Sequence, residues 1–526
     1  MNSDLFDLSQ VVFTRRTDVV NPGKTIFNPE YSTVRTLRGH DQIIGSSSVS
    51  YDLGVSLKVA AEDIGLGLNP VNSAEFINQR KHYVDGIINK GELYTNKGRD
   101  IVNGSATAKV TAVAQTVSEA IAIANTVDAT AIANSVAFAE IAAIANGINN
   151  SGKISTGLGS DTVSGELKAA VAAVATASID VKAIANAVAQ TPMSEGLKAI
   201  AAGFAISIAK AQVVATGINN QHGEIRTGDG ADYISATATS YSASFAEAET
   251  SAFAIATPEN QALFQAVVAA IAQTQDTAIA INNQYGDIRT GYGADQIDAT
   301  ANASDNAIGI YNKYGYIATG YGSDTINATA NASGNAIGIY NNYGYITTGY
   351  GSDTINATAN AYNYAIAIDN NYGYITTGYG SDTINATANA SGNAIAIDNQ
   401  YGEIITGYGA DTIEAYATGS QSYGIYGGNI ATGYGNDVLK ASSFGGGVNI
   451  NMGYGADYVE GFGDATVYGG EDFDTLSLGS HNKSDFNIYT NNGFIVFELG
   501  GISMETSGFE KYTFADGNYY SNNLIA

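Results

Sequence analysis

The stretch DTINATANASGNAIGIYNNYGYITTGYGS, residues 324–352, decides the fold because closely similar units follow one another along the chain. The aspartates that close the TGYGxD hexapeptide recur every 29 residues, at Asp295, Asp324, Asp353, Asp382 and Asp411. Isoleucines keep the same step in four rows: Ile279, Ile308, Ile337, Ile366 and Ile395; Ile281, Ile310, Ile339, Ile368 and Ile397; Ile288, Ile317, Ile346, Ile375 and Ile404; Ile297, Ile326, Ile355, Ile384 and Ile413. A fixed period of this length is typical of a solenoid.

Each unit has the pattern of strands separated by turns. Apolar and polar residues alternate around Ile355, Ala357 and Ala359 and again around Ile366 and Ile368, which favours strands. Turn residues follow in Ser-Gly-Asn, Asn-x-Tyr-Gly and Thr-Gly-Tyr-Gly-Ser-Asp. We therefore predict an all-β, right-handed parallel β-solenoid, a β-helix or enlarged β-roll, with about three strands per coil and rungs about 4.8 Å apart.

The repeat extends beyond the regular run with altered spacing. Acidic turns precede it at Asp41, Asp100, Asp161 and Asp232 and follow it at Asp437, Asp457 and Asp474. We expect an N-terminal cap over residues 1–30, coils with long insertions over 31–290, a regular solenoid over 291–478 and a C-terminal cap over 479–526.

The insertions are rich in alanine and suit helices. In TPENQALFQAVVAAIAQTQD, which begins at Thr257, Pro258 and Glu259 resemble a helix start and apolar residues follow at helical spacing. A second helix could begin at Ser194, although strings such as EAIAIAN also suit strands. We predict helical insertions packed along one flank of the N-terminal half.

The acidic turns have the chemistry of a calcium site. Two glycines permit positive φ and close backbone approach, and the aspartate supplies a hard oxygen. Ca²⁺ takes six to eight oxygen ligands, more than one short turn offers, so we expect each ion to lie between stacked turns along one corner. The predicted metal residues are Gly157, Gly159, Asp161, Gly228, Gly230, Asp232, Gly291, Gly293, Asp295, Gly320, Gly322, Asp324, Gly349, Gly351, Asp353, Gly378, Gly380, Asp382, Gly407, Gly409, Asp411, Gly433, Gly435, Asp437, Gly453, Gly455, Asp457 and Asp474.

Other interpretations of the repeated residues stay open. The aspartates could cap backbone amides in a metal-free β-helix, although uncompensated carboxylates at about 4.8 Å repel one another. The asparagines at 283, 312, 341, 370 and 399 fit a stacked amide row. The tyrosines fit stacked turn aromatics or a carbohydrate-binding stripe. The repeated Asn327, Thr329 and Asn331 could form a flat face for a periodic surface such as ice, or be ordinary solvent-facing residues.

Composition limits the partners. The chain has 526 residues, no cysteine, and 50 acidic against 23 basic residues, a formal charge of −27. This charge argues against nucleic acid and anionic membranes and favours cations. No stretch makes a convincing membrane span. Asp4 and Asp7 lie where a signal peptide would be basic and then apolar, so we expect no conventional N-terminal signal.

The turns resemble the calcium-binding RTX (repeats-in-toxin) family, whose nonapeptide GGxGxDxUx winds a calcium-bound β-roll. Gly469 to Leu476 come closest to the first two glycines of that motif, and Thr319 to Ile326 match it apart from the initial threonine. The ending FEKYTFADG resembles the segment that follows RTX repeats in proteins exported by type I secretion. The resemblance implies Ca²⁺ as cofactor and a secreted, extracellular protein.

Some turns depart from the family pattern. Leu37 and Asn96 replace the first glycine before Asp41 and Asp100, and Asp472 replaces the second glycine before Asp474. Calcium binding at these three turns is therefore an open question. The 29-residue step also differs from the eighteen-residue coil of a regular β-roll.

We expect a structural or surface-associated protein and not an enzyme. The four histidines form no HExxH motif, and no GxSxG elbow occurs. An adhesin or ice-binding module using the Asn/Thr face is the alternative. A polysaccharide-modifying β-helix enzyme using residues such as Arg226 and Arg289 stays open. The surface or polysaccharide partner and the assembly state are not specified by the sequence.

Overall fold

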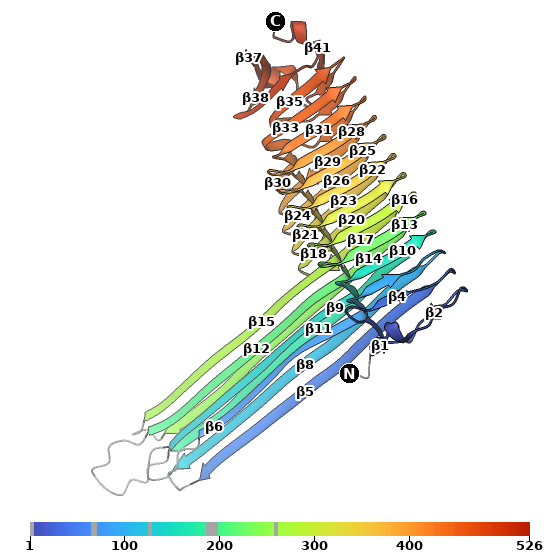
Figure 1. Ribbon diagram of the computed structural model, residues 1–526. Helices are drawn as coiled ribbons and strands as arrows, with labels where there is room; N and C mark the ends of the chain where they lie inside the picture. The colour runs from blue at the N-terminus through green and yellow to red at the C-terminus, as the bar shows by residue number, and fades with distance from the viewer. Residues whose placement is uncertain (1–4, 65–70, 125–128, 186–197, 257–260, 526) are drawn as a thin grey trace.

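The chain folds as a long parallel β-solenoid from which a flat arm projects sideways (Figure 1). The computed structural model describes residues 5–64, 71–124, 129–185, 198–256 and 261–525. Its strands form one 26-stranded and one 15-stranded sheet, joined by parallel pairing of like residues in successive coils. No helix among the described residues has the length and apolar character needed to cross a bilayer.

The regular coils have three strands each, as the repeat predicts. The 15-stranded sheet contributes one strand to each regular coil: β17 (Gln296–Ala303), β20 (Thr325–Ala332), β23 (Thr354–Ala361), β26 (Thr383–Ala390) and β29 (Thr412–Thr418). It continues into the shorter coils that follow as β32 (Val438–Ala441), β34 (Tyr458–Glu460) and β36 (Thr475–Ser477). The other sheet contributes two strands per regular coil: β18 (Asn306–Tyr311), β19 (Tyr316–Tyr321), β21 (Asn335–Tyr340), β22 (Tyr345–Tyr350), β24 (Tyr364–Asp369), β25 (Tyr374–Tyr379), β27 (Asn393–Asp398), β28 (Glu403–Tyr408), β30 (Gln421–Tyr426) and β31 (Asn429–Tyr434). The inward isoleucines and alanines of these strands form the core.

The arm consists of the outer parts of eight long strands in two layers. One layer contains β5 (Gln42–Ile64), β8 (Ile101–Ala124), β11 (Thr162–Ala185) and β14 (Tyr233–Ala256), and the other contains β6 (Val71–Asn89), β9 (Ala129–Asn150), β12 (Lys198–Asn219) and β15 (Gln261–Asn282). Small residues such as Ala173, Ala175 and Ala209 fill the space between the layers and are fully buried. The two layers can pack closely because these side chains are short.

The prediction of helical insertions was wrong. The described parts of both segments are strands: Lys198–Asn219 is β12 and Gln261–Asn282 is β15. Thr257, Pro258, Glu259 and Ser194 lie outside the described residues. Alanine favours helix intrinsically, but here β12 pairs with β9 on one side and β15 on the other, residue by residue. This pairing with neighbouring coils overrides the local propensity.

Shorter strands complete the coils at the base of the arm and the two ends of the solenoid. Along the arm these are β7 (Glu92–Tyr94), β10 (Lys153–Leu158), β13 (Glu224–Asp229) and β16 (Asp287–Tyr292). The N-terminal end has β1 (Leu5–Asp7), the 3-10 turn η1 (Leu8–Gln10), β2 (Val19–Val20), β3 (Thr25–Asn28) and β4 (Thr33–Arg35). The C-terminal end has β33 (Phe444–Tyr454), β35 (Gly463–Glu471), η2 (Lys483–Asp485), β37 (Asn487–Asn491), β38 (Phe494–Leu499), β39 (Ile502–Ser507), β40 (Lys511–Phe514), β41 (Gly517–Tyr520) and η3 (Ser521–Asn523). Antiparallel pairing of β37, β38 and β39 and of β40 and β41 ends the parallel stack.

Candidate functional site

The nine GxGxD turns have one shared backbone geometry. Their first glycines have φ between 100° and 109° and their second glycines φ between 125° and 145°. A β-carbon at Gly351 would collide with the carbonyl oxygen of Gly322 in the preceding coil. Glycine is therefore needed both for the left-handed backbone and for the close approach of successive turns.

The aspartates of successive turns form one continuous row, here called the aspartate row. Oδ1 of each carboxylate accepts a hydrogen bond of 2.8 to 2.9 Å from the backbone N–H of the aspartate in the preceding coil. The row contains Asp41, Asp100, Asp161, Asp232, Asp295, Asp324, Asp353, Asp382, Asp411, Asp437, Asp457 and Asp474. All predicted metal-binding aspartates are thus brought together along one corner.

The second oxygen of every carboxylate in the row lacks a hydrogen-bond partner. All twelve aspartates are at most 2% exposed, and each Oδ2 is buried without a donor. Burial without a donor costs about 1–3 kcal/mol for a polar group and more for a charged one. An arrangement repeated twelve times in one row calls for a proton or a cation that the protein atoms do not supply.

Burial shifts the titration of these carboxyls upward. Loss of hydration raises the pKa of Asp161, Asp324 and Asp353 to about 6, and neighbouring carboxylates of the row add to the effect. Burial raises the pKa of Asp232 and Asp457 to about 7. A backbone N–H donor lowers the pKa of both carboxyls, and the side chain of Thr227 also lowers that of Asp232, without cancelling the rise. The protein atoms alone therefore disfavour the ionised form of these carboxyls.

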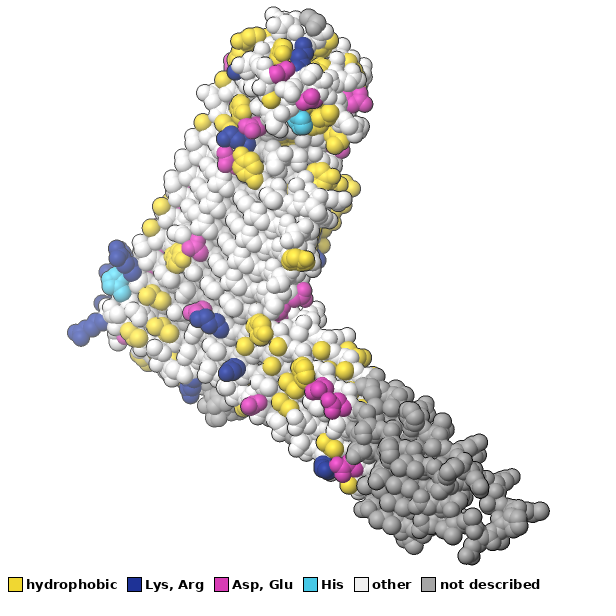
Figure 2. All heavy atoms as spheres, turned by 180° about the vertical axis from the view of Figure 1, so that it is seen from behind, with side chains coloured by type: hydrophobic (Ala, Val, Ile, Leu, Met, Phe, Trp, Pro, Cys, Tyr) yellow, Lys and Arg dark blue, Asp and Glu magenta, His cyan; other side chains and the backbone are white. Residues whose placement is uncertain are grey.

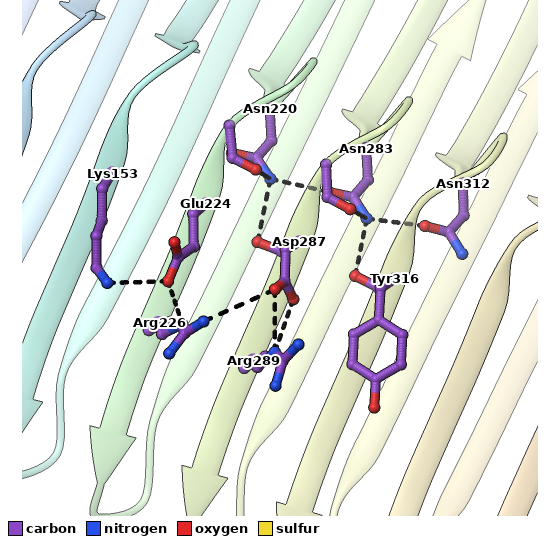
Figure 3. Close-up of polar contacts among 11 residues, drawn as sticks. Lys153, Asn220, Glu224, Arg226, Asn283, Asp287, Arg289, Asn312 and Tyr316 are labelled. Carbon is purple, nitrogen blue, oxygen red and sulfur yellow. Dashed lines mark hydrogen bonds and ion pairs between the residues drawn. The ribbon is translucent and has the colours of Figure 1, made fainter.

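A second buried polar row shows what a satisfied ladder looks like. Asn28, Asn89, Asn150, Asn220, Asn283, Asn312, Asn341, Asn370 and Asn399 are 0 to 1% exposed. Each side-chain amide except the last donates at 2.7 to 2.8 Å to the amide oxygen of the next asparagine. Figure 3 shows Asn220, Asn283 and Asn312 of this row. The predicted amide row is confirmed and is longer than the sequence analysis gave it.

The asparagine and aspartate rows differ in their hydrogen-bonding capacity, and this difference affects cation binding. A neutral amide both donates and accepts, so a stack of amides satisfies itself. A carboxylate accepts only, so a stack of carboxylates cannot. Ca²⁺ prefers such oxygens together with main-chain carbonyls. The aspartate row therefore fits calcium, because its Oδ2 atoms are acceptors without a donor and lie beside the main chain of the glycine turns.

A site of this kind would rely on main-chain ligands. Among the described residues there is no group of three or more His, Cys, Asp or Glu side chains that could hold a metal ion. This agrees with one carboxylate per coil, because the remaining oxygens would have to come from the backbone of the glycine turns.

The three irregular turns divide into two kinds. Asp41 and Asp100 belong to the row, but Gly39 and Gly98 lack the positive φ of the other turns. Asp474 also belongs to the row, and Asp472 adopts φ 83°, in the left-handed region, at the position of the missing glycine. The turn at Asp474 therefore has the positive φ at this position that the turns at Asp41 and Asp100 lack.

Two residues that the sequence analysis missed end the row. The backbone N–H of Asp18 donates to Asp41 Oδ1 at 2.9 Å, which places Asp18 one rung before the first acidic turn. At the other end Glu510 accepts from the N–H of Asp474 at 2.7 Å, as the aspartate of a further coil would. Neither lies in a glycine turn, so no repeat signal marks them.

Stacked tyrosines flank the turns. Tyr285, Tyr314, Tyr343, Tyr372 and Tyr401 stack with ring centroids 4.8 to 5.2 Å apart. Tyr292, Tyr321, Tyr350, Tyr379, Tyr408, Tyr434 and Tyr454 stack at 4.7 to 4.8 Å. These stacks are the turn aromatics that the repeat predicted, and both remain partly exposed.

The arginines considered for an enzyme lie in ion pairs on the surface. Figure 3 shows Glu224 between Lys153 and Arg226, and Asp287 beside Arg226 and Arg289. Lys153 Nζ lies 3.0 Å from Glu224, and Arg289 Nε lies 2.9 Å from Asp287. Each arginine thus has a carboxylate partner from its own or a neighbouring coil.

Comparison with known proteins identifies no family for the chain. No family model and no curated protein matches the chain. One similar solved structure is described as a hyperactive, Ca²⁺-dependent, beta-helical antifreeze protein from an Antarctic bacterium. The similarity covers 84% of this chain and 95% of that chain, at 15% identity and a TM-score of 0.26. At that level the two chains have no established residue correspondence.

Proposed function

We propose that the chain is a secreted calcium-binding β-solenoid, a structural or surface-associated protein whose coils are held together by Ca²⁺ along the aspartate row. The observation that supports this proposal is the row of twelve buried Oδ2 atoms without a donor. The bound cation would supply the missing positive charge between successive carboxylates, which otherwise repel one another. The nine turns with two left-handed glycines are the expected sites, and Asp474 with Asp472 is a tenth.

The extracellular assignment follows from how such a row would behave. Calcium binding that requires stacked turns couples binding to folding. The chain would stay loose where calcium is scarce and fold where it is plentiful. The resemblance of the turns and of FEKYTFADG to RTX proteins supports export by a type I route. The role proposed is structural and not catalytic.

Calcium stoichiometry tests the proposal. The native chain is expected to bind about nine Ca²⁺, one in each gap between the ten turns. Asp353→Asn removes a carboxylate that borders two gaps, so it should lower the stoichiometry by one or two. Isothermal titration calorimetry of calcium-stripped protein, checked by elemental analysis, would measure this.

The matched control is Asp298→Asn. Asp298 lies on β17, outside the row, where it accepts a hydrogen bond from Asn327. Both substitutions remove one negative charge, so a long-range charge effect would change both alike. Equal stoichiometry in the native chain and in both variants would refute the proposal.

A second candidate function is recognition of a periodic surface by the outer face of the regular coils. Asn327, Asn356 and Asn385 are linked by amide hydrogen bonds of 2.8 to 2.9 Å, as are Asn331, Asn360 and Asn389 at 2.9 to 3.0 Å. A column of threonines, Thr329, Thr358 and Thr387, lies in register between them. Figure 2 shows few charged side chains over the regular coils on the face it presents. An uncharged face with fixed side chains suits a flat, repetitive partner such as ice or a polysaccharide.

Substitution of the threonine column separates this candidate from a passive scaffold. Thr329→Tyr, Thr358→Tyr and Thr387→Tyr together should abolish ice or surface binding without lowering the calcium stoichiometry. Thermal hysteresis and retention on immobilised polysaccharide are the two measurements. No difference from the native chain in either would remove the outer face as the functional surface.

A further inference from the structure

The last rung of the arm is open along one edge. β14 pairs with β11 over its whole length, but β17 covers only Tyr233–Thr239. β15 likewise pairs with β12, whereas β18 covers only residues 277–282. On the side away from β11 and β12, no described strand lies beside residues 240–256 or 261–276. The two layers therefore present two long rows of unpaired backbone groups side by side, and Figure 1 shows this edge facing the side of the C-terminal coils.

The interior of the arm is also open at this edge. Ala270 and Ala272 of β15 are exposed, whereas Ser207 and Ala209, their partners in β12, are fully buried. On β14 the hydroxyls of Ser240 and Ser242 are buried and lack a hydrogen-bond partner. One further pair of strands, one in each layer, would cover these alanines. It would also supply hydrogen-bond donors and acceptors to the unpaired backbone groups of β14 and β15.

The opposite edge of the arm differs from the β14–β15 edge in its side chains. There, at β5 and β6, the rings of Tyr51 and His82 meet across the two layers at 5.3 Å. Charged residues occur along both strands: Asp52, Lys58, Glu62 and Asp63 in β5, and Glu75, Arg80, Lys81 and Asp85 in β6. In the unpaired stretch of β14 the charged residues are Glu247 and Glu249, whereas β15 has no charged residue from Gln261 to Gln275. Charged edge strands discourage pairing with another chain, so only the β14–β15 edge includes a long strand without this protection.

We propose that two copies of this chain associate through the β14–β15 edge, with β14 beside β14 and β15 beside β15 of the second copy. A partner must supply two strands of matching length at the spacing of the two layers, and a second arm does so. A two-fold axis perpendicular to the layers sets each strand antiparallel to its counterpart and keeps each sheet continuous.

The oligomeric state of matched variants tests this interface. Ile77, Phe138, Ile208 and Ile271 occupy one column across β6, β9, β12 and β15. Ile271 at the proposed interface is 44% exposed and Ile77 at the opposite edge is 55% exposed. Sedimentation equilibrium in millimolar Ca²⁺ should give a dimer for the native chain and for Ile77→Glu. Ile271→Glu places like charges near the two-fold axis and should raise the dimer dissociation constant at least about tenfold.

A second variant and the alternative assemblies complete the test. Thr274→Lys, at another exposed position of β15, should weaken the dimer in the same way, and circular dichroism should show both variants folded. A monomeric native chain at all concentrations, or an Ile271→Glu variant that dimerises as tightly as the native chain, would overturn the proposal. So would open-ended polymers, because these indicate head-to-tail contact between the two different edges.

Discussion

Removal of calcium is expected to lower the melting temperature of the protein by about 20 °C or to unfold it outright at room temperature. Each site held at one hundred times its dissociation constant contributes about 2.7 kcal/mol to folding. The unfolding entropy increases with chain length, which is 526 residues here. Dividing the summed binding free energy of nine such sites by this entropy gives a shift in melting temperature of this size. The aspartate row makes the effect large, because without the cation its carboxylates remain buried and unpaired.

Circular dichroism during a calcium titration would measure this shift. The β signal should rise steeply with Ca²⁺, because each ion joins two turns and favours stacking of the next coil. Mg²⁺ is the control: it requires a smaller, more regular octahedral shell, so an equal concentration should give much less stabilisation. A chain that melts at one temperature in calcium, in magnesium and after stripping of metals would show that the row does not bind cations.

The pH dependence of stability is expected to reverse when calcium is removed. In the folded chain burial raises the pKa of Asp161 to about 6 and the pKa of Asp232 and Asp457 to about 7, against 3.8 for an unperturbed carboxyl. Between pH 4 and 7 the metal-free folded state therefore binds more protons than the unfolded state, and its stability falls as pH rises. Acidification from pH 8 to pH 5 should raise the melting temperature of the stripped protein. Allowing about 1 kcal/mol for each shifted carboxyl, the rise is about 5 °C.

The calcium-loaded protein should show the opposite trend. Its carboxylates are ionised and bound to the cation, so protons compete with Ca²⁺ as the pH falls through about 6. Thermal melts from pH 4.5 to 8, on protein stripped with a chelating resin and on protein in millimolar Ca²⁺, would give two curves of opposite slope. Parallel curves would argue against both the cation and the raised pKa values. The asparagine row does not titrate and contributes to neither slope.

The candidate site was predictable where it repeats and not where it ends. The GxGxD motif recurs in nine turns, so the sequence identifies their glycines and aspartates as candidate ligands. The structure aligns those aspartates in one row. Asp18 and Glu510 adjoin the two ends of the aspartate row but lie in segments without the motif, so only the spatial stacking identifies them. The unpaired Oδ2 atoms are likewise a property of the packed turns, because the sequence does not say which oxygen a neighbouring coil will satisfy.

The sequence by itself determined the regular solenoid, because a 29-residue period forces like residues above one another and period-two alternation separates core from surface. It also determined the amide row, since stacked asparagines satisfy each other without outside help. Only the tertiary structure decided that the long insertions form the strands of the arm. Alanine-rich segments suit a helix or a buried strand equally well, and pairing with coils 61 to 71 residues away selected the strand. That pairing joins segments distant along the chain, so local propensity carries no information about it.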